Sequence, residues 1–115
     1  MKMCHVTINV SDLEKSIEFY EDVLKIKVLG DMRGMGMPIV FLGEEEKDVK
    51  VELIGNKENA FKGSGISAGF HVADLDAAYE EVKNMGYQVS PMISPNPNVR
   101  FFFVSDPDGF QIQLI

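Results

Sequence analysis

Few residues in this chain could carry chemistry, and two of them lie at its start. Cys4 and His5 open an apolar stretch, and Glu52 interrupts another, Val49–Ile54. An imidazole or a carboxylate can bind a divalent metal ion or transfer a proton. A second histidine, His71, lies in the other half of the chain. The glycines lack the spacing of a P-loop or a dinucleotide-binding fingerprint, so we expect no nucleotide site.

Strands and one helix are expected to position these groups in the first half. The alternation of apolar and polar residues over Cys4–Val10 predicts a strand on which Cys4 is a core residue and His5 points away from it. Ser11–Glu14 fits a helix capping box, and apolar residues then recur at helical spacing to about Lys25. Three short strands are predicted next, at residues 27–29, 38–42 and 49–54.

The second half contains the same kinds of element. A connector over residues 56–65 precedes a predicted strand at 66–72 and a helix that begins after Asp74 and stops at Gly86. Further strands are predicted at 87–89, 99–104 and 110–115, the last two joined by a type I turn at 106–109.

The two halves repeat one plan, βαβββ. Val10–Leu13 overlays Val72–Leu75 with an offset of 62 residues, and Val51–Leu53 overlays Ile112–Leu114 with an offset of 61. We therefore predict an α+β fold in which two βαβββ modules form a half-open, eight-stranded cup with the helices outside. Module 1 is expected at about 1–55 and module 2 at about 66–115, within a single domain of residues 1–115.

Two segments resemble the vicinal oxygen chelate superfamily, which includes glyoxalase I, bleomycin- and fosfomycin-resistance proteins and extradiol dioxygenases. They are the strand-helix entry HVTINVSDLEKSIEFY (5–20) and the ending FVSDPDGFQIQL (103–114). The resemblance spans the whole chain and is closest in arrangement to glyoxalase I. It implies a glyoxalase-like domain and a homodimer in which two chains complete each cup.

The resemblance also implies a metal site with two ligands from each module. His5 and Glu52 match the first pair and suit Ni²⁺, Zn²⁺, Co²⁺ or Mn²⁺. The second pair falls on Ser67 and Gln113, where the family pattern has histidine and glutamate. An amide oxygen is a weak ligand and a neutral hydroxyl a poor one, so we expect weak metal binding through His5, Glu52 and Gln113. Glu52 is then the one carboxylate left as a catalytic base.

A small-molecule ligand or substrate is expected against polar residues of the same strands, namely Thr7, Asn9, Ser67, His71 and Gln111. His71 lies four residues beyond Ser67, about 13 Å along a strand, which is too far to replace it as a metal ligand. His71 is therefore interpreted as part of a pocket wall or as a hydrogen-bonded residue at a strand end.

Two apolar segments could also line a ligand site. Phe101, Phe102 and Phe103 are consecutive, so at least one ring must project from each face of their strand. One face is expected in the core, and the other could form the floor of the cup. The segment of Met32, Met35 and Met37 could line the cup or pack against the core.

Charge and composition argue against several other partners. The 115 residues include 11 Lys and Arg against 18 Asp and Glu, a net charge of −7, so nucleic acids and anionic membranes should repel the protein. One cysteine, no signal peptide and no spanning apolar run predict a soluble protein of the reducing cytoplasm.

Two functions remain open at this point. The first is a small-molecule-binding member of the superfamily with a depleted metal site. The second is a divalent-metal-dependent lyase or isomerase like glyoxalase I, which would use His5 and Glu52. We favour the first because Gln113 cannot accept a proton as the glutamate of the family pattern can.

Overall fold

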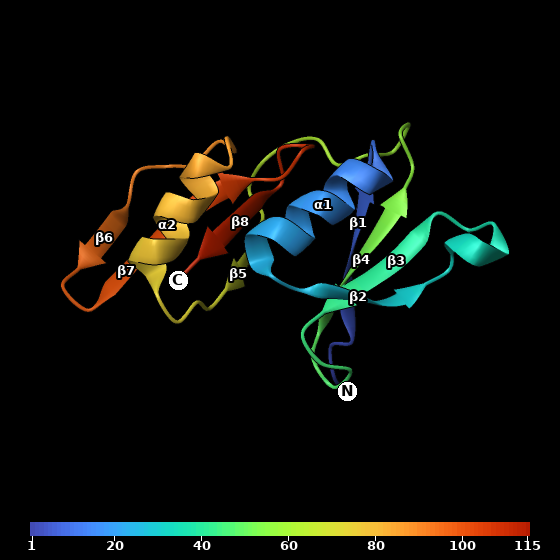
Figure 1. Ribbon diagram of the computed structural model, residues 1–115, viewed down its shortest axis with the longest axis horizontal. Helices are drawn as coiled ribbons and strands as arrows, with labels where there is room; N and C mark the ends of the chain where they lie inside the picture. Colours follow the sequence, from blue (N-terminus) through green and yellow to red (C-terminus); the bar gives the residue numbers. More distant parts are fainter. The chain divides into compact units, whose positions relative to one another are not determined.

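The chain folds into two compact units, each with one α-helix and one four-stranded sheet (Figure 1). The computed structural model describes all residues from Met1 to Ile115. Unit 1 comprises residues 1–62 and unit 2 residues 63–115. The predicted α+β fold of two βαβββ modules with open sheets is confirmed.

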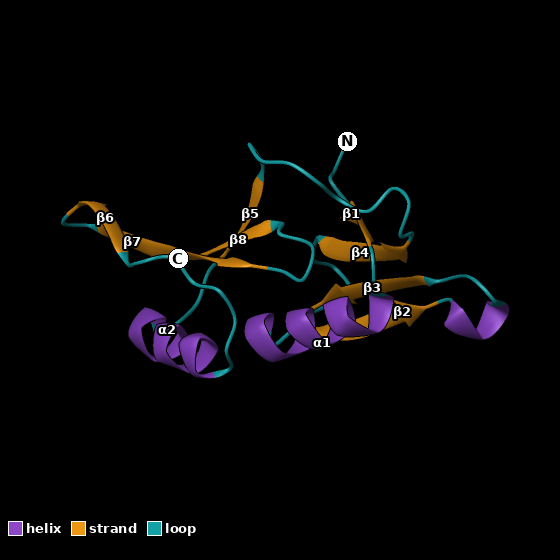
Figure 2. Cartoon of the chain, turned by 90° about the horizontal axis from the view of Figure 1, so that it is seen from above, coloured by secondary structure: helices purple, strands orange, loops and turns teal.

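Unit 1 has the sheet order β1-β4-β3-β2, in which β1 and β4 are parallel and the other neighbours antiparallel. Helix α1 covers one face of this sheet (Figure 2), where Val40, Leu42 and Leu53 are fully buried. The opposite face has no helix over it. The elements are β1 (His5–Val10), α1 (Leu13–Leu24), β2 (Lys27–Asp31), the 3-10 turn η1 (Arg33–Met35), β3 (Ile39–Gly43) and β4 (Lys50–Gly55).

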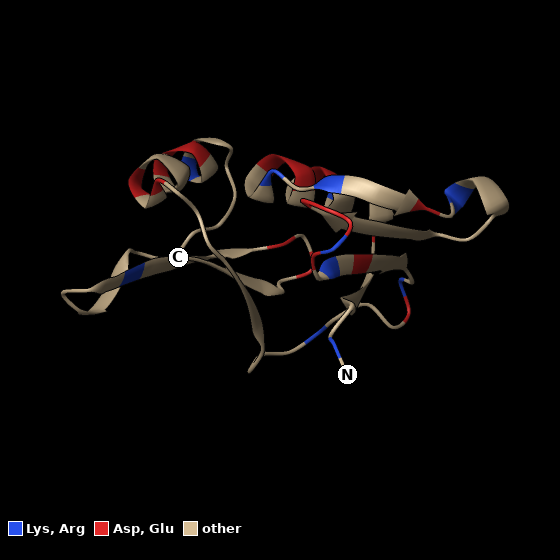
Figure 3. Cartoon of the chain, turned by 90° about the horizontal axis from the view of Figure 1, so that it is seen from below, with Lys and Arg blue, Asp and Glu red and all other residues tan.

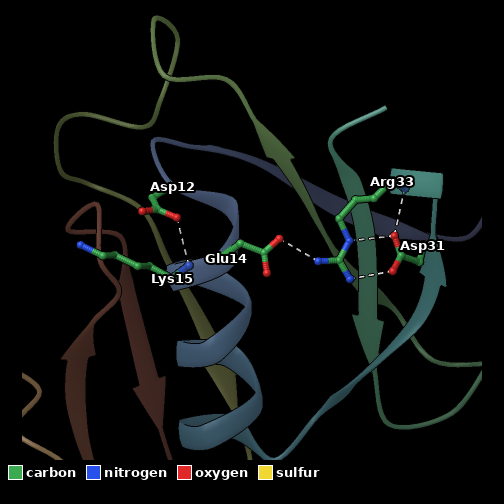
Figure 4. Close-up of polar contacts among 5 residues, drawn as sticks. All are labelled: Asp12, Glu14, Lys15, Asp31 and Arg33. Carbon is green, nitrogen blue, oxygen red and sulfur yellow. Dashed lines mark hydrogen bonds and ion pairs between the residues drawn. The ribbon is translucent and has the colours of Figure 1, made fainter. Parts of the chain in front are cut away.

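The ends of α1 have specific caps. Asp12 is the N-cap, and its carboxylate accepts a hydrogen bond from the backbone N–H of Lys15 at 3.2 Å (Figure 4). The capping box over residues 11–14 predicts Ser11 as the N-cap, one residue earlier; serine and aspartate serve equally well at this position, so the pattern alone does not separate them. Lys25 ends the helix in the left-handed conformation, with φ of 58°.

An ion-pair cluster ties η1 to the first turn of α1. The Nε and Nη2 groups of Arg33 donate to the two carboxylate oxygens of Asp31 at 2.9 and 2.7 Å, and Nη1 donates to Glu14 at 2.8 Å (Figure 4). The hydrogen bonds from Arg33 lower the pKa of Asp31 to about 2. The same bonds raise the pKa of Arg33.

The start of β1 is less buried than the alternation predicted. Cys4 is exposed and lies outside the strand, where the alternation no longer sets the direction of its side chain. Val6 remains 37% exposed, so the core begins only at Ile8. The prediction that Cys4 is a core residue is therefore wrong.

Unit 2 has the sheet order β5-β8-β7-β6, with β5 and β8 parallel. Asp74 is the N-cap of its helix, as predicted, and accepts from the N–H of Ala77. The helix packs on β7, where the rings of Tyr79 and Phe102 have centroids 4.9 Å apart. The elements are β5 (Ser67–Phe70), α2 (Leu75–Asn84), β6 (Ile93–Asn96), β7 (Val99–Ser105) and β8 (Gln111–Leu114).

The predicted strand at 87–89 is wrong. This segment makes a single bridge, between Val89 and Val104, and the fourth strand of the sheet is β6. The N–H of Ser90 still donates to the carbonyl of Phe103 at 2.8 Å, but the N–H of Phe103 donates to the side-chain hydroxyl of Ser90 at 2.9 Å, so the backbone pairing with β7 stops there.

Charged residues are distributed unevenly over the elements. Both helices carry bands of acidic residues (Figure 3), whereas strands β5 to β8 contain one charged residue, Arg100. Neither helix is long and apolar enough to cross a membrane.

The two faces of β7 should respond differently to truncation. Phe102 is fully buried under α2, so Phe102→Ala should lower the free energy of unfolding by roughly 3–5 kcal/mol. Phe101→Ala removes the same ring from the half-buried opposite face and should cost less. Urea unfolding followed by far-ultraviolet circular dichroism measures both, and equal losses would contradict this assignment of faces.

The Asp31–Arg33 pair should make stability depend on pH. The pKa of Asp31 is lower in the folded chain than the ordinary value of about 3.9, so its stabilisation is complete above pH 4 and is lost as the pH falls toward 2. The thermal midpoint of the wild type should exceed that of Asp31→Asn at pH 7, and the two should converge near pH 2.

Asp22→Asn provides the matched control, because Asp22 is an exposed residue of α1 outside this cluster. It should not reproduce the loss that Asp31→Asn causes at pH 7. A deficit of Asp31→Asn that persisted undiminished at pH 2 would show that the ion pair is not its cause.

Candidate functional site

The helix-free face of unit 1 brings together residues from three strands. In the parallel pairing of β1 with β4, Thr7 lies opposite Glu52, and in the antiparallel pairing of β3 with β4, Phe41 does. The neighbours of Glu52 on β4 are buried in the core, so Glu52 projects from the helix-free face. His5 lies two residues before Thr7 and shares its face.

His5 and Glu52 form the polar centre of this face. The Nε2 atom of His5 is 3.5 Å from a carboxylate oxygen of Glu52, and their side chains are 38% and 13% exposed. The hydroxyl of Thr7 donates a hydrogen bond to the same carboxylate oxygen. Two donors each about 2.1 Å from a tetrahedral metal ion lie about 3.4 Å apart, so this pair has the spacing of two metal ligands.

Three neighbours restrain the imidazole of His5. Its ring packs edge-on against Phe41, with centroids 5.5 Å apart and planes at 74°. A Cβ at Gly30 would lie 3.3 Å from the Phe41 ring, so a side chain at position 30 would crowd this ring. The Sγ atom of Cys4 is 3.3 Å from Nδ1 of His5. This contact corrects the expectation that His5 points away from Cys4, and it leaves Nε2 directed at Glu52.

The matching face of unit 2 repeats the strand pairing with different residues. Gly69 and Phe103 both lie opposite Gln113, as Thr7 and Phe41 lie opposite Glu52. Gln113 is half-buried, and its amide has no hydrogen-bond partner in the protein. The overlay inferred from the sequence therefore holds at the level of strand register.

The metal-binding potential of the chain rests on a pair of residues. The structure has no group of three or more His, Cys, Asp or Glu side chains that could hold a metal ion. His5 and Glu52 fit two positions of a divalent site by donor type and spacing. Ser67 and Gln113, the other two positions implied by the resemblance, offer neutral oxygens.

A cavity of about 300 Å³ opens on unit 2. It is lined by Gly65, Ile66, Ser67, Phe103 and Gln111. The structure thus brings two of the predicted ligand contacts, Ser67 and Gln111, to one cavity. Of the three consecutive phenylalanines, Phe102 lies in the core, as expected for one face of the strand, and Phe103 on the other face lines the cavity.

Two other predicted ligand contacts do not line this cavity. Asn9 is half-buried near the end of β1, and its carbonyl accepts a hydrogen bond from the N–H of Phe61 at 2.9 Å. His71 is exposed just after β5 ends and does not line the cavity.

Sequence reasoning missed two residues that shape these faces. Phe41 packs on His5, and the offset of 62 residues that relates the modules maps it onto Phe103, so the overlay could have found it. Ser105 accepts a hydrogen bond from the Gln111 amide at 2.6 Å. Nothing in the sequence marks this serine.

A wider cavity of about 500 Å³ lies in unit 1. Its lining residues are Leu13, Glu14, Arg33, Gly36, Met37 and Pro38. Met37 thus lines a cavity, as one interpretation of the methionine segment allowed, whereas Met35 is 69% exposed and does not pack in the core. The guanidinium of Arg33 is already paired with two carboxylates there.

Comparisons with known proteins cover nearly the whole chain. The profile of the Glyoxalase/Bleomycin resistance protein/Dioxygenase superfamily matches residues 2–114. The lactoylglutathione lyase of Neisseria meningitidis serogroup A is 32% identical over 124 aligned positions, which cover 100% of this chain and 90% of that protein.

Solved structures with the same fold include an enzyme and a binding protein. The trypanothione-dependent glyoxalase I of Leishmania major has a TM-score of 0.79 at 28% identity, over 100% of this chain and 86% of that one. TnmS3, an antibiotic-binding protein from Streptomyces sp. CB03234, has a TM-score of 0.78 at 25% identity, over 99% and 93%. On this strand register and these matches, the chain belongs to the Glyoxalase/Bleomycin resistance protein/Dioxygenase superfamily.

Proposed function

We propose that this protein binds a small molecule on the helix-free faces of its sheets and holds a divalent metal ion only weakly. One observation carries the proposal. Where the strand register of unit 1 presents His5 and Glu52, the same register in unit 2 presents Ser67 and Gln113. The second module therefore supplies neither a strong metal ligand nor a base.

The loss of the second carboxylate bears directly on catalysis. Glyoxalase-type isomerisation moves a proton between adjacent carbon atoms, which requires a carboxylate beside the metal ion. The amide of Gln113 cannot accept that proton. It can still donate and accept hydrogen bonds, as ligand recognition requires.

The residues of unit 1 fit a weak metal site. A divalent ion, when bound, polarises a carbonyl oxygen of the ligand. His5 and Glu52 would hold such an ion, and Thr7 orients the carboxylate through its hydrogen bond. Phe41 packs against the His5 ring and limits its rotation.

A divalent-metal-dependent lyase or isomerase like glyoxalase I is the second candidate. Two observations favour it: similarity to lactoylglutathione lyases over the whole chain, and a Glu52 carboxylate that is largely buried beside His5. Glu52 would then act as the catalytic base.

We also propose that residues 1–115 form one glyoxalase-like domain that functions as a cytoplasmic homodimer. An open sheet carrying apolar side chains on its helix-free face needs cover, which a second sheet can provide. Phe41, Phe101 and Phe103 are half-buried on these faces within one chain. The acidic net charge favours neither a nucleic acid nor an anionic membrane as partner.

Metal affinity separates the two candidate functions. We expect little bound metal after chelator treatment, weak calorimetric binding of Ni²⁺ and Zn²⁺, and negligible turnover of a methylglyoxal–thiol hemithioacetal. Ser67→His with Gln113→Glu should tighten metal binding by more than the ~10–100-fold that an outer-shell partner contributes. Elemental analysis and titration calorimetry measure these effects.

The matched control is Ser67→His with Gln111→Glu, which places the new carboxylate two residues away on the same strand face. It should not restore tight binding. Submicromolar binding by the unmodified protein, abolished by His5→Ala, would instead establish the metal-dependent lyase as the better candidate.

The oligomeric state tests the proposed dimer. Light scattering at micromolar concentration should give about twice the chain mass of 12.8 kDa. A mass near that of a single chain, unchanged up to tenfold higher concentration, would contradict it.

A further inference from the structure

The two modules differ in what packs on the phenylalanine that they share, Phe41 in unit 1 and Phe103 in unit 2. In unit 1 the imidazole of His5 packs edge-on against Phe41. In unit 2 the matching positions are Ser67 and Phe103, and the cavity of about 300 Å³ lies beside both. A serine side chain has no ring, so no ring from position 67 packs on Phe103 as the imidazole of His5 packs on Phe41. Phe103 has instead the ring of Phe101, on its own strand, edge-on with centroids 5.7 Å apart.

The polar wall of this cavity has a fixed orientation. Both N–H groups of the Gln111 amide are used: one donates to Ser105 Oγ at 2.6 Å and one to the carbonyl of Gly109 at 3.3 Å. A carbonyl oxygen can only accept, so the amide nitrogen must lie on that side. The Oε1 atom of Gln111 is left without a protein partner, as is the hydroxyl of Ser67.

The cavity is also uncharged. None of its five lining residues is ionisable at neutral pH. The one charged residue on the strands of unit 2, Arg100, is paired with Asp76 at 2.5 Å. An anionic ligand would find no counter-charge in the lining, and the net charge of −7 would repel it.

From this geometry we propose that the cavity of unit 2 binds a planar, uncharged ring that carries an N–H or O–H donor. The ring packs against Phe103, as His5 packs against Phe41, and its donor bonds to Oε1 of Gln111. Ser67 supplies a second hydrogen-bonding group. This inference rests on the proposed function, because it names the class of small molecule that the protein would bind.

Pyrazole is a suitable probe, because it is a flat, neutral ring with one N–H. We expect it to shift the amide resonances of residues 65–67, 103 and 111 of the ¹⁵N-labelled protein in a saturable way. A ring of five atoms should bind with a dissociation constant on the order of millimolar. EDTA in every sample excludes binding of the probe to a metal ion.

Two analogues test the two chemical features. 1-Methylpyrazole has the same ring without the donor, and benzoate has a ring with a negative charge. Both should bind at least about tenfold more weakly than pyrazole, the effect of one lost hydrogen bond to a half-buried acceptor or of one uncompensated charge. Equal binding of either analogue would overturn the proposed ligand class.

Two variants test the place of binding. Ser67→His places an imidazole ring in the cavity and should weaken pyrazole binding at least about tenfold. The variant should fold, because the matching position of unit 1 already holds a histidine, His5. Ser94→His adds the same ring to an exposed position of β6 and should leave binding unchanged. Unaltered pyrazole binding to folded Ser67→His would overturn the proposal.

Gln111→Leu tests the proposed hydrogen-bond acceptor without changing the size of the cavity much. It removes the acceptor at similar size, so pyrazole and 1-methylpyrazole should then bind alike. A preference for pyrazole that survived this change would also overturn the proposal.

The outcome is separable from that of the proposed function. Pyrazole binding together with tight metal binding and turnover would overturn the proposed function and support the cavity. Weak metal binding without any pyrazole response would support the weak metal site of the proposed function and overturn the ligand class proposed for the cavity.

Discussion

The parallel pairing of the first and last strands of each module is the constraint on which the helix-free faces depend. Because side chains alternate along a strand, a slip of one residue between β1 and β4 would send Glu52 into the core. The apolar residues on either side of Glu52 prevent that slip, since they are buried beneath α1. The packing of the helix thus determines which polar residues meet on the opposite face.

The two faces of each sheet have different roles, which explains how two modules with the same fold can present different polar side chains. The residues beneath α1 and α2 are apolar in both units and carry the stability. The helix-free positions are half-buried or exposed, so they can change from imidazole and carboxylate to hydroxyl and amide at small cost to folding. One module keeps a metal-binding pair, and the other keeps the same register around an uncharged cavity.

The sequence predicted the elements whose pattern is local and strong. The helix that follows Asp74 and the alternation in β4 both rest on spacing alone, and the structure has them. The alternation over residues 87–89 predicts a strand, but it does not reveal that the Ser90 hydroxyl accepts the N–H of Phe103 and so ends the backbone pairing. The sequence predicted Ser67 and Gln111 as ligand contacts, but the orientation of the Gln111 amide depends on hydrogen bonds to Ser105 and to a backbone carbonyl that no sequence pattern marks.

Two differences between the modules are connected: Glu52 in unit 1 corresponds to Gln113 in unit 2, and the residue opposite it changes from Thr7 to Gly69. A half-buried carboxylate needs hydrogen-bond donors, and Thr7 supplies one to Glu52. The corresponding residue opposite Gln113 is Gly69, which has no side chain to donate. A Cβ at Gly69 would lie 3.3 Å from the Gln113 amide oxygen, so a larger residue would also crowd it. A carboxylate at position 113 would lack the donor that Glu52 has, and an uncharged amide is the residue type that the neighbouring glycine tolerates.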